Sequence, residues 1–184
     1  MTLFQPHPTP TQQWQWADAL HRMAKEDSPF AGQMERVPPS AEPDHCLCDQ
    51  LVVLCSYLLA LRDQAHLIHL NYIGTDFISV HAYLKERYEE HLDHFDTIAE
   101  YVRAYGKMMP MSVNELRNAY PDFNGKECIC AYLENITKLA DLTRAIEKTA
   151  TAERSIDVAN SLAEITAAAG KAAWFLRLTT GEQT

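Results

Sequence analysis

The sequence predicts an all-α protein built around a four-helix bundle. Glycine is rare, with 6 residues in 184, and hydrophobic residues make up 47% of the chain. Apolar side chains recur every three or four positions over long stretches, which is the spacing of helices that bury one face. A chain of this length and hydrophobic content is expected to form one domain with a full core.

The amino-terminal segment, residues 1–44, is expected to be an extension outside that core. Thr9 and Pro10 can start a short amphipathic helix, as its N-cap and its first helical residue. A proline-bearing linker follows at residues 37–43. We therefore divide the chain into an extra helical segment at 1–44 and a bundle domain at 45–184.

Four long helices are expected in the bundle domain, at residues 46–72, 76–105, 126–149 and 155–178. Gly74 and Gly106 mark the ends of the first two, because glycine is a usual signal at a helix C-terminus. Residues 108–125 are long enough to form a crossover that carries a short helix at 112–118. Two antiparallel helix pairs joined by one long crossover have the connectivity of a ferritin-like bundle.

The second expected helix carries two stripes of side chains. At 100° per residue, its apolar face is predicted to contain Phe77, Val80, Leu84, Tyr88, Leu92, Phe95, Ala99 and Val102. A polar stripe runs beside this face and contains His81, Lys85, Glu89, Asp96 and Glu100. A polar stripe on the shoulder of a buried face is well placed to meet a second subunit.

The polar stripe predicts a metal site between two subunits. Two copies of the helix can cross antiparallel about a two-fold axis that lies just after Glu90. His81 of one copy then faces Glu100 of the other, Lys85 faces Asp96, and every site is made twice. Neutral imidazole and carboxylate together suit iron or zinc better than magnesium or calcium. The spacing alone leaves a solvated face of a charged helix equally open.

The composition excludes several classes of protein. The longest apolar run, residues 51–61, is too short to span a membrane, and no secretion signal is evident at the amino end. Five cysteines, an odd number, fit a reduced cytoplasm better than a disulfide framework. The formal net charge of −9 opposes binding to nucleic acid. We expect a cytoplasmic protein with no membrane contact and no direct DNA binding.

Several short motifs between residues 44 and 178 resemble those of a known family. They are His69-Leu70-Asn71, Gly74, Phe77-Ile78, Val80-His81, His91-Leu92-Asp93, Asp96-Thr97-Ile98-Ala99-Glu100 and Lys171-Ala172-Ala173-Trp174-Phe175-Leu176. The chain resembles the Dps family, the mini-ferritins also called DNA-binding proteins from starved cells. His69, His81, Asp96 and Glu100 all fall at the metal-ligand positions of that family.

The resemblance implies a hollow homo-dodecamer that oxidises ferrous iron with peroxide or dioxygen and stores the ferric mineral. In that family the ferroxidase site lies at a two-fold interface. His69 and His81 would come from one subunit, and Asp96 and Glu100 from its mate. Iron is the implied metal, and zinc is possible at the same site.

Lys85 departs from the family pattern, which has a carboxylate four residues after the second histidine. A protonated ammonium cannot bind a metal, and two unit charges ~4 Å apart repel by roughly 4 kcal/mol at an effective dielectric of 20. In the outcome that we prefer, the lysine swings to solvent and leaves a weakened site, to which His66 could add an imidazole. In the alternative, ferroxidase activity is weak or lost and the cage acts as a metal-sequestering or scaffold assembly.

Acidic residues near the junction of the last two helices are candidate pore residues. Glu153 and Asp157 lie there, and in the resembled family acidic residues near this junction line iron-entry pores. The lysine-rich tail on which DNA binding in that family usually relies is missing at both ends of this chain.

Two further clusters of possible metal ligands are interpreted as ordinary side chains. Cys46 and Cys48 would start one helix and Cys128 and Cys130 another, at opposite ends of the bundle, so ordinary thiols are favoured over a zinc site. A surface metal site at Glu90, His91 and His94 is possible, but a solvated polar face is preferred.

Overall fold

The computed structural model describes residues 45–118 and 123–181. The expected amino-terminal helix, the linker and Pro121 of the crossover lie outside the described residues. The described part is all-helical, and within it no strand is found.

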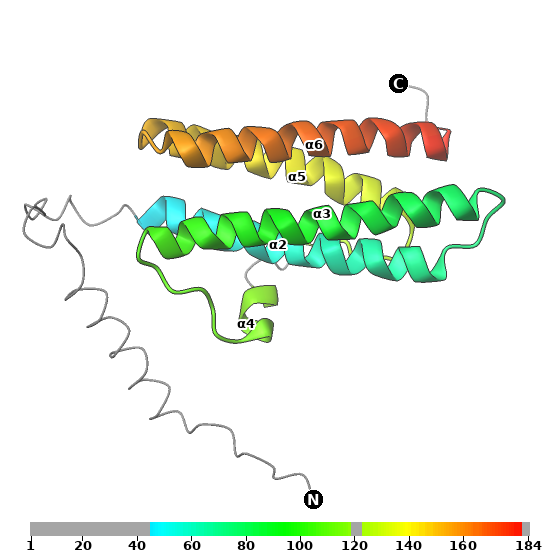
Figure 1. Ribbon diagram of the computed structural model, residues 1–184, viewed down its shortest axis with the longest axis horizontal. Coiled ribbons are helices and arrows are strands. Elements are labelled where there is room, and N and C mark those ends of the chain that lie inside the picture. Colours follow the sequence, from blue (N-terminus) through cyan, green and yellow to red (C-terminus); the bar gives the residue numbers. More distant parts are fainter. Residues whose placement is uncertain (1–44, 119–122, 182–184) are drawn as a thin grey trace, which may run out of the picture. The chain divides into compact units, whose positions relative to one another are not determined.

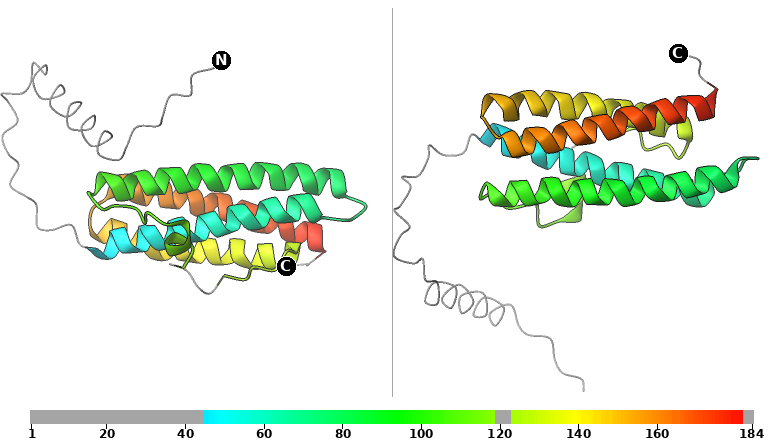
Figure 2. Two further views of the ribbon diagram at one scale, coloured as in Figure 1. Left: turned by 90° about the horizontal axis from the view of Figure 1, so that it is seen from below. Right: turned by 45° about the horizontal axis from the view of Figure 1, so that its top comes forward.

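Five helices follow one another along the described chain (Figure 1). They are α2 His45–Asn71, α3 Phe77–Ala104, α4 Val113–Asn118, α5 Ile129–Ala152 and α6 Ile156–Thr180. α2 packs mainly against α3, and α5 packs mainly against α6, so the bundle consists of two helix pairs. Figure 2 shows the two pairs lying along each other from two further directions. The predicted fold class, an all-α ferritin-like bundle with a long crossover, is confirmed.

The crossover runs the length of the bundle, because α3 ends at one end of it and α5 begins at the other (Figure 1). Its short helix α4 packs on α2, and Leu116 is buried there. Arg117 of α4 donates to Asp63 of α2 at 2.7 Å. Ser112 starts α4, since its side-chain oxygen accepts the backbone N–H of Glu115 at 3.4 Å.

The core is apolar, with a small polar network at one end. α2 contributes Leu47, Leu51, Leu54, Leu58 and Leu61, all buried. Gln64 of α2 donates to the backbone oxygens of Asn124 and Lys126 at 2.9 and 2.7 Å. Asn135 of α5 donates to the side chain of Gln64 at 2.9 Å. These bonds fix the end of the crossover onto two core helices and satisfy buried polar groups.

α2 is also the one described helix that is long and apolar enough to cross a membrane by length and composition. Its window Leu47–Asn71 has a mean hydropathy of 1.4, and 56% of that window is buried inside the bundle. A core helix of a bundle passes the same test, so this helix is weak evidence for a membrane span.

The predicted helix ends are close to the observed ones, and two of them are explained by glycines in the left-handed region. Gly106 follows α3 with φ +83°, and Gly181 ends α6 with φ +74°. L-residues with a side chain rarely adopt this conformation, which is why glycine stands at these positions. α5 begins later than predicted, at Ile129, because Cys128 is its N-cap and accepts the backbone N–H of Ala131 at 3.4 Å.

The predicted apolar face of α3 is wrong in detail. Phe77 and Leu92 are each 41% exposed, whereas His91 is only 2% exposed. The inward line runs through Val80, Leu84, His91, Ile98 and Val102. The helix is therefore rotated so that a histidine takes a core position and Leu92 joins the exposed polar stripe. We call the residues His81, Lys85, Glu89, Leu92, Asp96 and Glu100 the outer stripe.

Candidate metal centre

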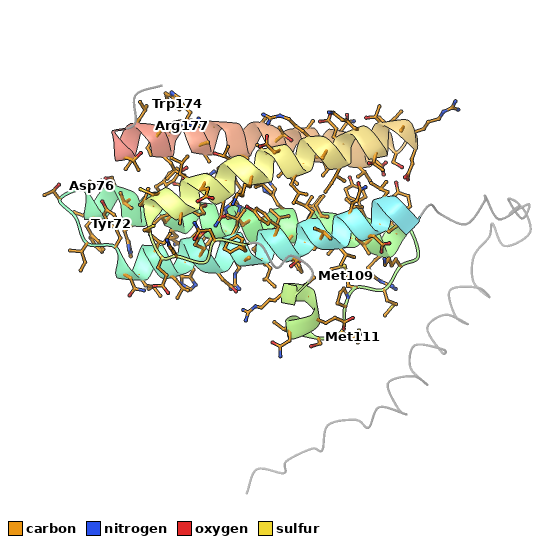
Figure 3. All side chains as sticks on the ribbon, turned by 180° about the vertical axis from the view of Figure 1, so that it is seen from behind. Tyr72, Asp76, Met109, Met111, Trp174 and Arg177 are labelled. Carbon is orange, nitrogen blue, oxygen red and sulfur yellow. The ribbon has the colours of Figure 1, made fainter. Side chains whose placement is uncertain are left out.

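Two histidines meet where α2 ends and α3 begins, and we call His69 and His81 the histidine pair. His69 lies in the last turns of α2 and is buried, while His81 lies near the start of α3 and is half-buried. Their rings stack with centroids 3.6 Å apart and planes inclined by 19°. Near the same turn, Tyr72 donates to Asp76 at 2.7 Å, and Figure 3 labels both residues there.

The backbone fixes the orientation of both rings. Nδ1 of His69 lies 2.7 Å from the carbonyl oxygen of His81, and Nδ1 of His81 lies 2.9 Å from the carbonyl oxygen of His69. A carbonyl can only accept, so both Nδ1 atoms must carry the proton. In the neutral rings each Nε2 atom then keeps its lone pair. Metal-binding histidines are commonly oriented in this way, with one ring nitrogen bound to a backbone oxygen and the other left for the metal.

Aromatic rings surround the histidine pair on the side of the bundle formed by α2 and α3. Phe77 lies 5.0 Å from His81, and Tyr88 lies 5.5 Å from His69, both measured between ring centroids. His66 lies 6.0 Å from His69 and 4.5 Å from Tyr88. The ring of His66 therefore belongs to the same cluster, one helical turn before His69.

Within one protomer, the predicted acidic ligands are far from the histidine pair. Asp96 and Glu100 are exposed on the second half of α3. Asp96 lies fifteen positions after His81, which corresponds to about 22 Å along a helix. A single copy of the described chain therefore does not bring the four predicted ligands together, and they can meet only between two copies.

Lys85 is paired on its own helix. Its Nζ atom lies 3.8 Å from Oε1 of Glu89, and both side chains are 57% exposed. An exposed ion pair of this kind contributes little stability. The ammonium is therefore not fixed in place and is free to be displaced when another group approaches.

The candidate pore residues lie at the turn between α5 and α6. Glu153 is the C-cap of α5, and Asp157 lies in the first turn of α6. Both are exposed, and Arg154 lies between them with φ 60°. The turn therefore presents two carboxylates and one guanidinium to solvent at that end of the bundle.

The cysteines whose side chains the structure describes are not arranged as a metal site. Cys48 is buried near the start of α2, while Cys128 and Cys130 are exposed at the start of α5. These two helix starts lie at opposite ends of the bundle (Figure 1). Within the described residues, Cys48, Cys55, Cys128 and Cys130 are free thiols. This separation agrees with the interpretation as ordinary thiols.

The preferred interpretation of Glu90, His91 and His94 as a solvated polar face is wrong. His91 is 2% exposed, and its Nε2 atom lies 2.7 Å from the phenol oxygen of Tyr132. The signal that reasoning from the sequence missed was the heptad spacing, because His91 lies seven residues after Leu84 and seven before Ile98, both buried.

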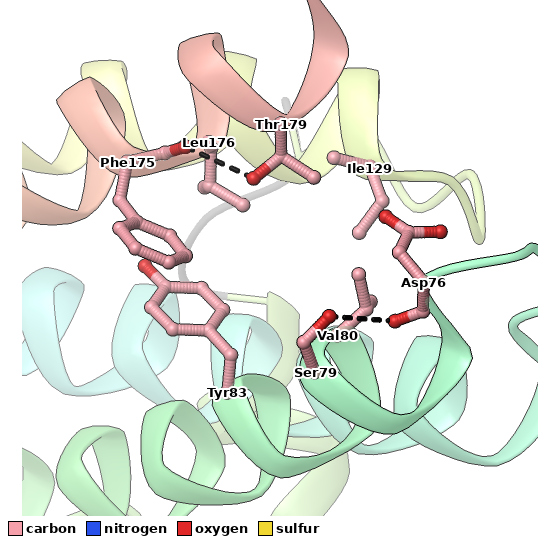
Figure 4. Close-up of a pocket in the computed structure, with 8 residues that line it drawn as sticks. All are labelled: Asp76, Ser79, Val80, Tyr83, Ile129, Phe175, Leu176 and Thr179. Carbon is pink, nitrogen blue, oxygen red and sulfur yellow. Dashed lines mark hydrogen bonds between the residues drawn. The ribbon is translucent and has the colours of Figure 1, made fainter.

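A small pocket lies between the start of α3 and the end of α6. It is lined by Asp76, Ser79, Val80, Tyr83, Ile129, Phe175, Leu176 and Thr179 (Figure 4). Tyr83 and Phe175 stack across it with centroids 4.7 Å apart. The lining is mostly apolar and offers a single carboxylate, so this pocket is a poorer candidate for metal chemistry than the histidine pair.

Residues 48–182 match the ferritin-like domain family, so the chain belongs to that family. Its fold is that of the Dps proteins within this family. The Dps protein of Vibrio cholerae O1, itself described as one of the ferritin-like diiron-carboxylate proteins, is 16% identical with a TM-score of 0.69; the match covers 74% of this chain and 89% of that one.

Two other solved structures show the same fold. The Dps protein of Bacillus brevis is 20% identical with a TM-score of 0.69, covering 74% of this chain and 95% of that one. The antigen TpF1 of Treponema pallidum is 24% identical with a TM-score of 0.69, covering 77% of this chain and 97% of that one. No curated protein sequence matches the chain. At these identities the structural neighbours share the fold, and function has to be argued from the residues of this chain.

Proposed function

We propose that this protein is an iron-oxidising and iron-storing mini-ferritin of the cytoplasm that removes ferrous iron and peroxide together. The observation that supports this most strongly is the histidine pair, whose two Nδ1 atoms are both held by backbone oxygens. That arrangement leaves two neighbouring Nε2 lone pairs directed away from the backbone. A ferrous ion is the substrate that this donor set suits best, and zinc is a competitor for the same ligands.

The site is completed by a second subunit. His69 and His81 of one subunit bind the ion together with Asp96 and Glu100 of the partner subunit. Two neutral imidazoles and two carboxylates carry a total charge of −2, which balances one divalent cation without leaving a buried net charge. The oxidant is peroxide or dioxygen; two ferrous ions supply the two electrons that reduce one peroxide, with two protons, to two water molecules.

The exposed apolar side chains of α2 and α3 support a contact on this face. Leu67 is 43% exposed, Leu70 60%, Phe77 41%, Ile78 83% and Leu92 41%. An apolar surface of this kind on a soluble bundle is typical of an interface. An isologous contact here would place each histidine pair beside the acidic half of the partner's α3. We propose that repeated contacts close the chain into a homo-dodecamer, as the Dps resemblance implies.

Lys85 weakens the second metal position without removing the first. Its exposed pairing with Glu89 at 3.8 Å does not fix the ammonium in place, which supports a side chain that can swing to solvent. His66 is close enough to the cluster to supply a further imidazole if the second position is used. The alternative function is a cage with weak or lost ferroxidase activity that sequesters metal or serves as a scaffold, and the charge of Lys85 is the observation that favours it.

Iron would enter near the turn between α5 and α6, where Glu153 and Asp157 are exposed. Residues 1–44 form a separate extension in this proposal, and residues 45–184 form the cage.

The net charge of −9 opposes phosphate binding, so we expect no shift of plasmid DNA on a gel at low ionic strength and neutral pH. A clear shift under those conditions would contradict this part of the proposal.

Stoichiometric peroxide added to ferrous iron, followed by ultraviolet absorbance of the ferric product, tests the proposed site. We expect His81→Gln to slow oxidation by on the order of 100-fold, because a metal ligand is lost. Glu86→Gln, exposed on the same helix and outside the outer stripe, is the control, and we expect its rate to match that of wild type. Equal rates for wild type and His81→Gln would exclude the histidine pair as the oxidation site.

A further inference from the structure

A second group of metal-binding side chains lies on α3, on a different face from the outer stripe. Glu90, His91 and His94 each place one ligand atom within 4.8 Å of the other two. We call these three residues the inner cluster. His91 is turned by about 80° around the helix from His81, and His94 by about 140°. His91 is buried and Glu90 and His94 are half-buried, so the inner cluster lies on a more buried side of α3 than the outer stripe.

His91 is a buried histidine with one unused nitrogen. Its Nε2 atom lies 2.7 Å from the hydroxyl oxygen of Tyr132 on α5. Its Nδ1 atom is buried and has no hydrogen-bond partner within the described part of the chain. An unsatisfied buried polar atom is costly, so this nitrogen is expected to have a partner that is not part of the protein.

Nδ1 of His94 also lacks a partner: it is buried and has no hydrogen bond among the described residues. Burial lowers the pKa of His91 to about 3 and also lowers the pKa of His94. A neutral imidazole is the form that can bind a metal, and burial favours this form of both rings. If Nε2 of His91 donates to Tyr132, the lone pair of Nδ1 is left free, which is the usual orientation of a metal-binding histidine.

Charges of both signs lie around the inner cluster, and most of those that act on His94 are negative. Asp93 on α3 and Glu164 on α6 are close enough to raise the pKa of His94, as does Glu90. Arg87 opposes them and donates to Oε2 of Glu90 at 2.6 Å. These three carboxylates act on His94, while on the other side Lys171 of α6 lines the same pocket as Glu90 and Arg87. Arg87 occupies one oxygen of Glu90 and is the group that a bound metal would have to displace or tolerate.

This arrangement differs from the carboxylate-rich site that a ferritin-like bundle can build from all four helices. The buried polar residues that the described parts of α2 and α5 contribute are Ser56, Gln64, His69, Asn135 and Thr143. Since none of these is acidic, α2 and α5 offer no buried carboxylate within the described residues. The donors of the inner cluster come instead from a single helix, with two nitrogens and one carboxylate.

We propose that Glu90, His91 and His94 form an intra-subunit site for one divalent transition-metal ion of the zinc type, separate from the site between subunits. Two imidazole nitrogens and one carboxylate are a common ligand set for Zn²⁺ and leave a fourth position open. A metal bound there would hold α3 against α5 through the hydrogen bond between His91 and Tyr132. The site would bind metal in an isolated subunit, because all three ligands belong to one chain.

Cobalt titration of the full chain tests this proposal, since Co²⁺ takes zinc sites and absorbs visible light when bound. The parent for the test carries His81→Gln and Asp96→Asn, which remove ligands of the proposed inter-subunit site. We expect this parent to bind one Co²⁺ per chain. Glu90→Gln and His94→Gln should each raise the Kd by more than about tenfold. Glu86→Gln, one turn earlier on α3 and exposed, is the matched control and should bind as the parent does.

Arg87→Gln separates loss of a ligand from loss of folding. Removing the guanidinium frees Oε2 of Glu90 and takes away a repelling charge, so this variant should bind Co²⁺ more tightly than the parent. The proposal is overturned if the parent binds no Co²⁺ stoichiometrically, or if Glu90→Gln and His94→Gln bind as tightly as the parent. Because the parent lacks two of the four inter-subunit ligands, and the outcome is judged by the effect of Glu90→Gln and His94→Gln, neither result depends on whether that other site functions.

Discussion

The reciprocal hydrogen bonds of His69 and His81 are the feature at residue scale on which the proposed chemistry depends. Each ring donates from Nδ1 to the backbone oxygen of the other residue, at 2.7 and 2.9 Å. The backbone thus sets the tautomer of both rings and the direction of both free nitrogens before any metal arrives. Such preorganised ligands bind a metal with little loss of conformational entropy.

Lys85→Asp is predicted to accelerate iron oxidation. The substitution removes a positive charge beside the proposed metal position and supplies a carboxylate where the family has one. Lys85 is 57% exposed, so solvent screens much of the effect, and we expect a rate increase of roughly tenfold. The measurement is the initial rate of ferric absorbance with stoichiometric peroxide.

Lys148→Asp makes the same change of charge at an exposed position on α5 and serves as the control. We expect its rate to match that of wild type. An unchanged rate in Lys85→Asp, or an equal acceleration in both variants, would show that Lys85 does not limit the site.

At the scale of the element, α3 shows what the sequence predicts well and what it does not. Its two ends were predicted to within one residue, and Gly106 was the local signal for the second of them. Its apolar face was predicted less well: Leu92 was expected inside and is 41% exposed, and His91 was expected outside and is buried. Helical periodicity locates a stripe, but it does not decide which of two neighbouring positions carries a buried polar residue. The hydrogen bond of His91 Nε2 comes from Tyr132 of α5, which the periodicity of α3 cannot reveal.

The sequence predicts the four ligands of the proposed inter-subunit site, but a single chain brings only two of them together. His69 and His81 are brought together within one chain, as their positions on either side of a turn allow. Asp96 and Glu100 depend on a second copy of α3, so their role follows from the dyad argument and the family resemblance and stays a prediction. The N-cap of α5 at Cys128 was also missed, since cysteine is not among the usual capping residues.

Substitution by alanine should change the free energy of unfolding in opposite directions at two glycines, one after α3 and one inside α6. Gly106 has φ +83°, so Gly106→Ala forces a side chain into the left-handed region and should lower the free energy of unfolding by about 1 kcal/mol. Gly170 lies inside α6, and a Cβ there would meet nothing within 4 Å in the protomer. Gly170→Ala should raise the free energy of unfolding by roughly 0.5–1 kcal/mol, since alanine favours helix.

Chemical denaturation followed by circular dichroism measures both changes. Both substitutions add the same methyl group, so a difference in sign between them reports the backbone conformation at each position. Destabilisation by both substitutions, or by neither, would contradict the assignment of these backbone conformations.

At the scale of the whole molecule, the proposed assembly depends on the outer face of α2 and α3. It carries exposed leucine, isoleucine and phenylalanine beside the charged residues of the outer stripe. In the proposed antiparallel contact, the charged residues would set the register and the apolar ones would supply the free energy. A net charge of −9 per chain opposes aggregation but also repels neighbouring subunits, so the contact must be specific.

Leu92→Asp is predicted to disrupt the assembly. Leu92 lies in the middle of the outer stripe and would be buried against the partner subunit, where an added carboxylate is costly. Native mass measurement should show smaller species for this variant. Thr97→Asp, exposed on another side of α3, is the charge-matched control and should assemble as wild type does. Full assembly of Leu92→Asp would show that the contact uses a different face.

Mixing two inactive variants tests the shared metal site most directly. One chain carries His69→Gln and His81→Gln, and the other carries Asp96→Asn and Glu100→Gln. After separate unfolding and joint reassembly, a mixed pair of subunits contains one complete site, because the histidines of one chain meet the acids of the other. We predict that ferroxidase activity returns to about a quarter of the wild-type value in the mixture, while each variant alone stays inactive. Mixed assemblies that show no recovery would contradict a site built by two subunits.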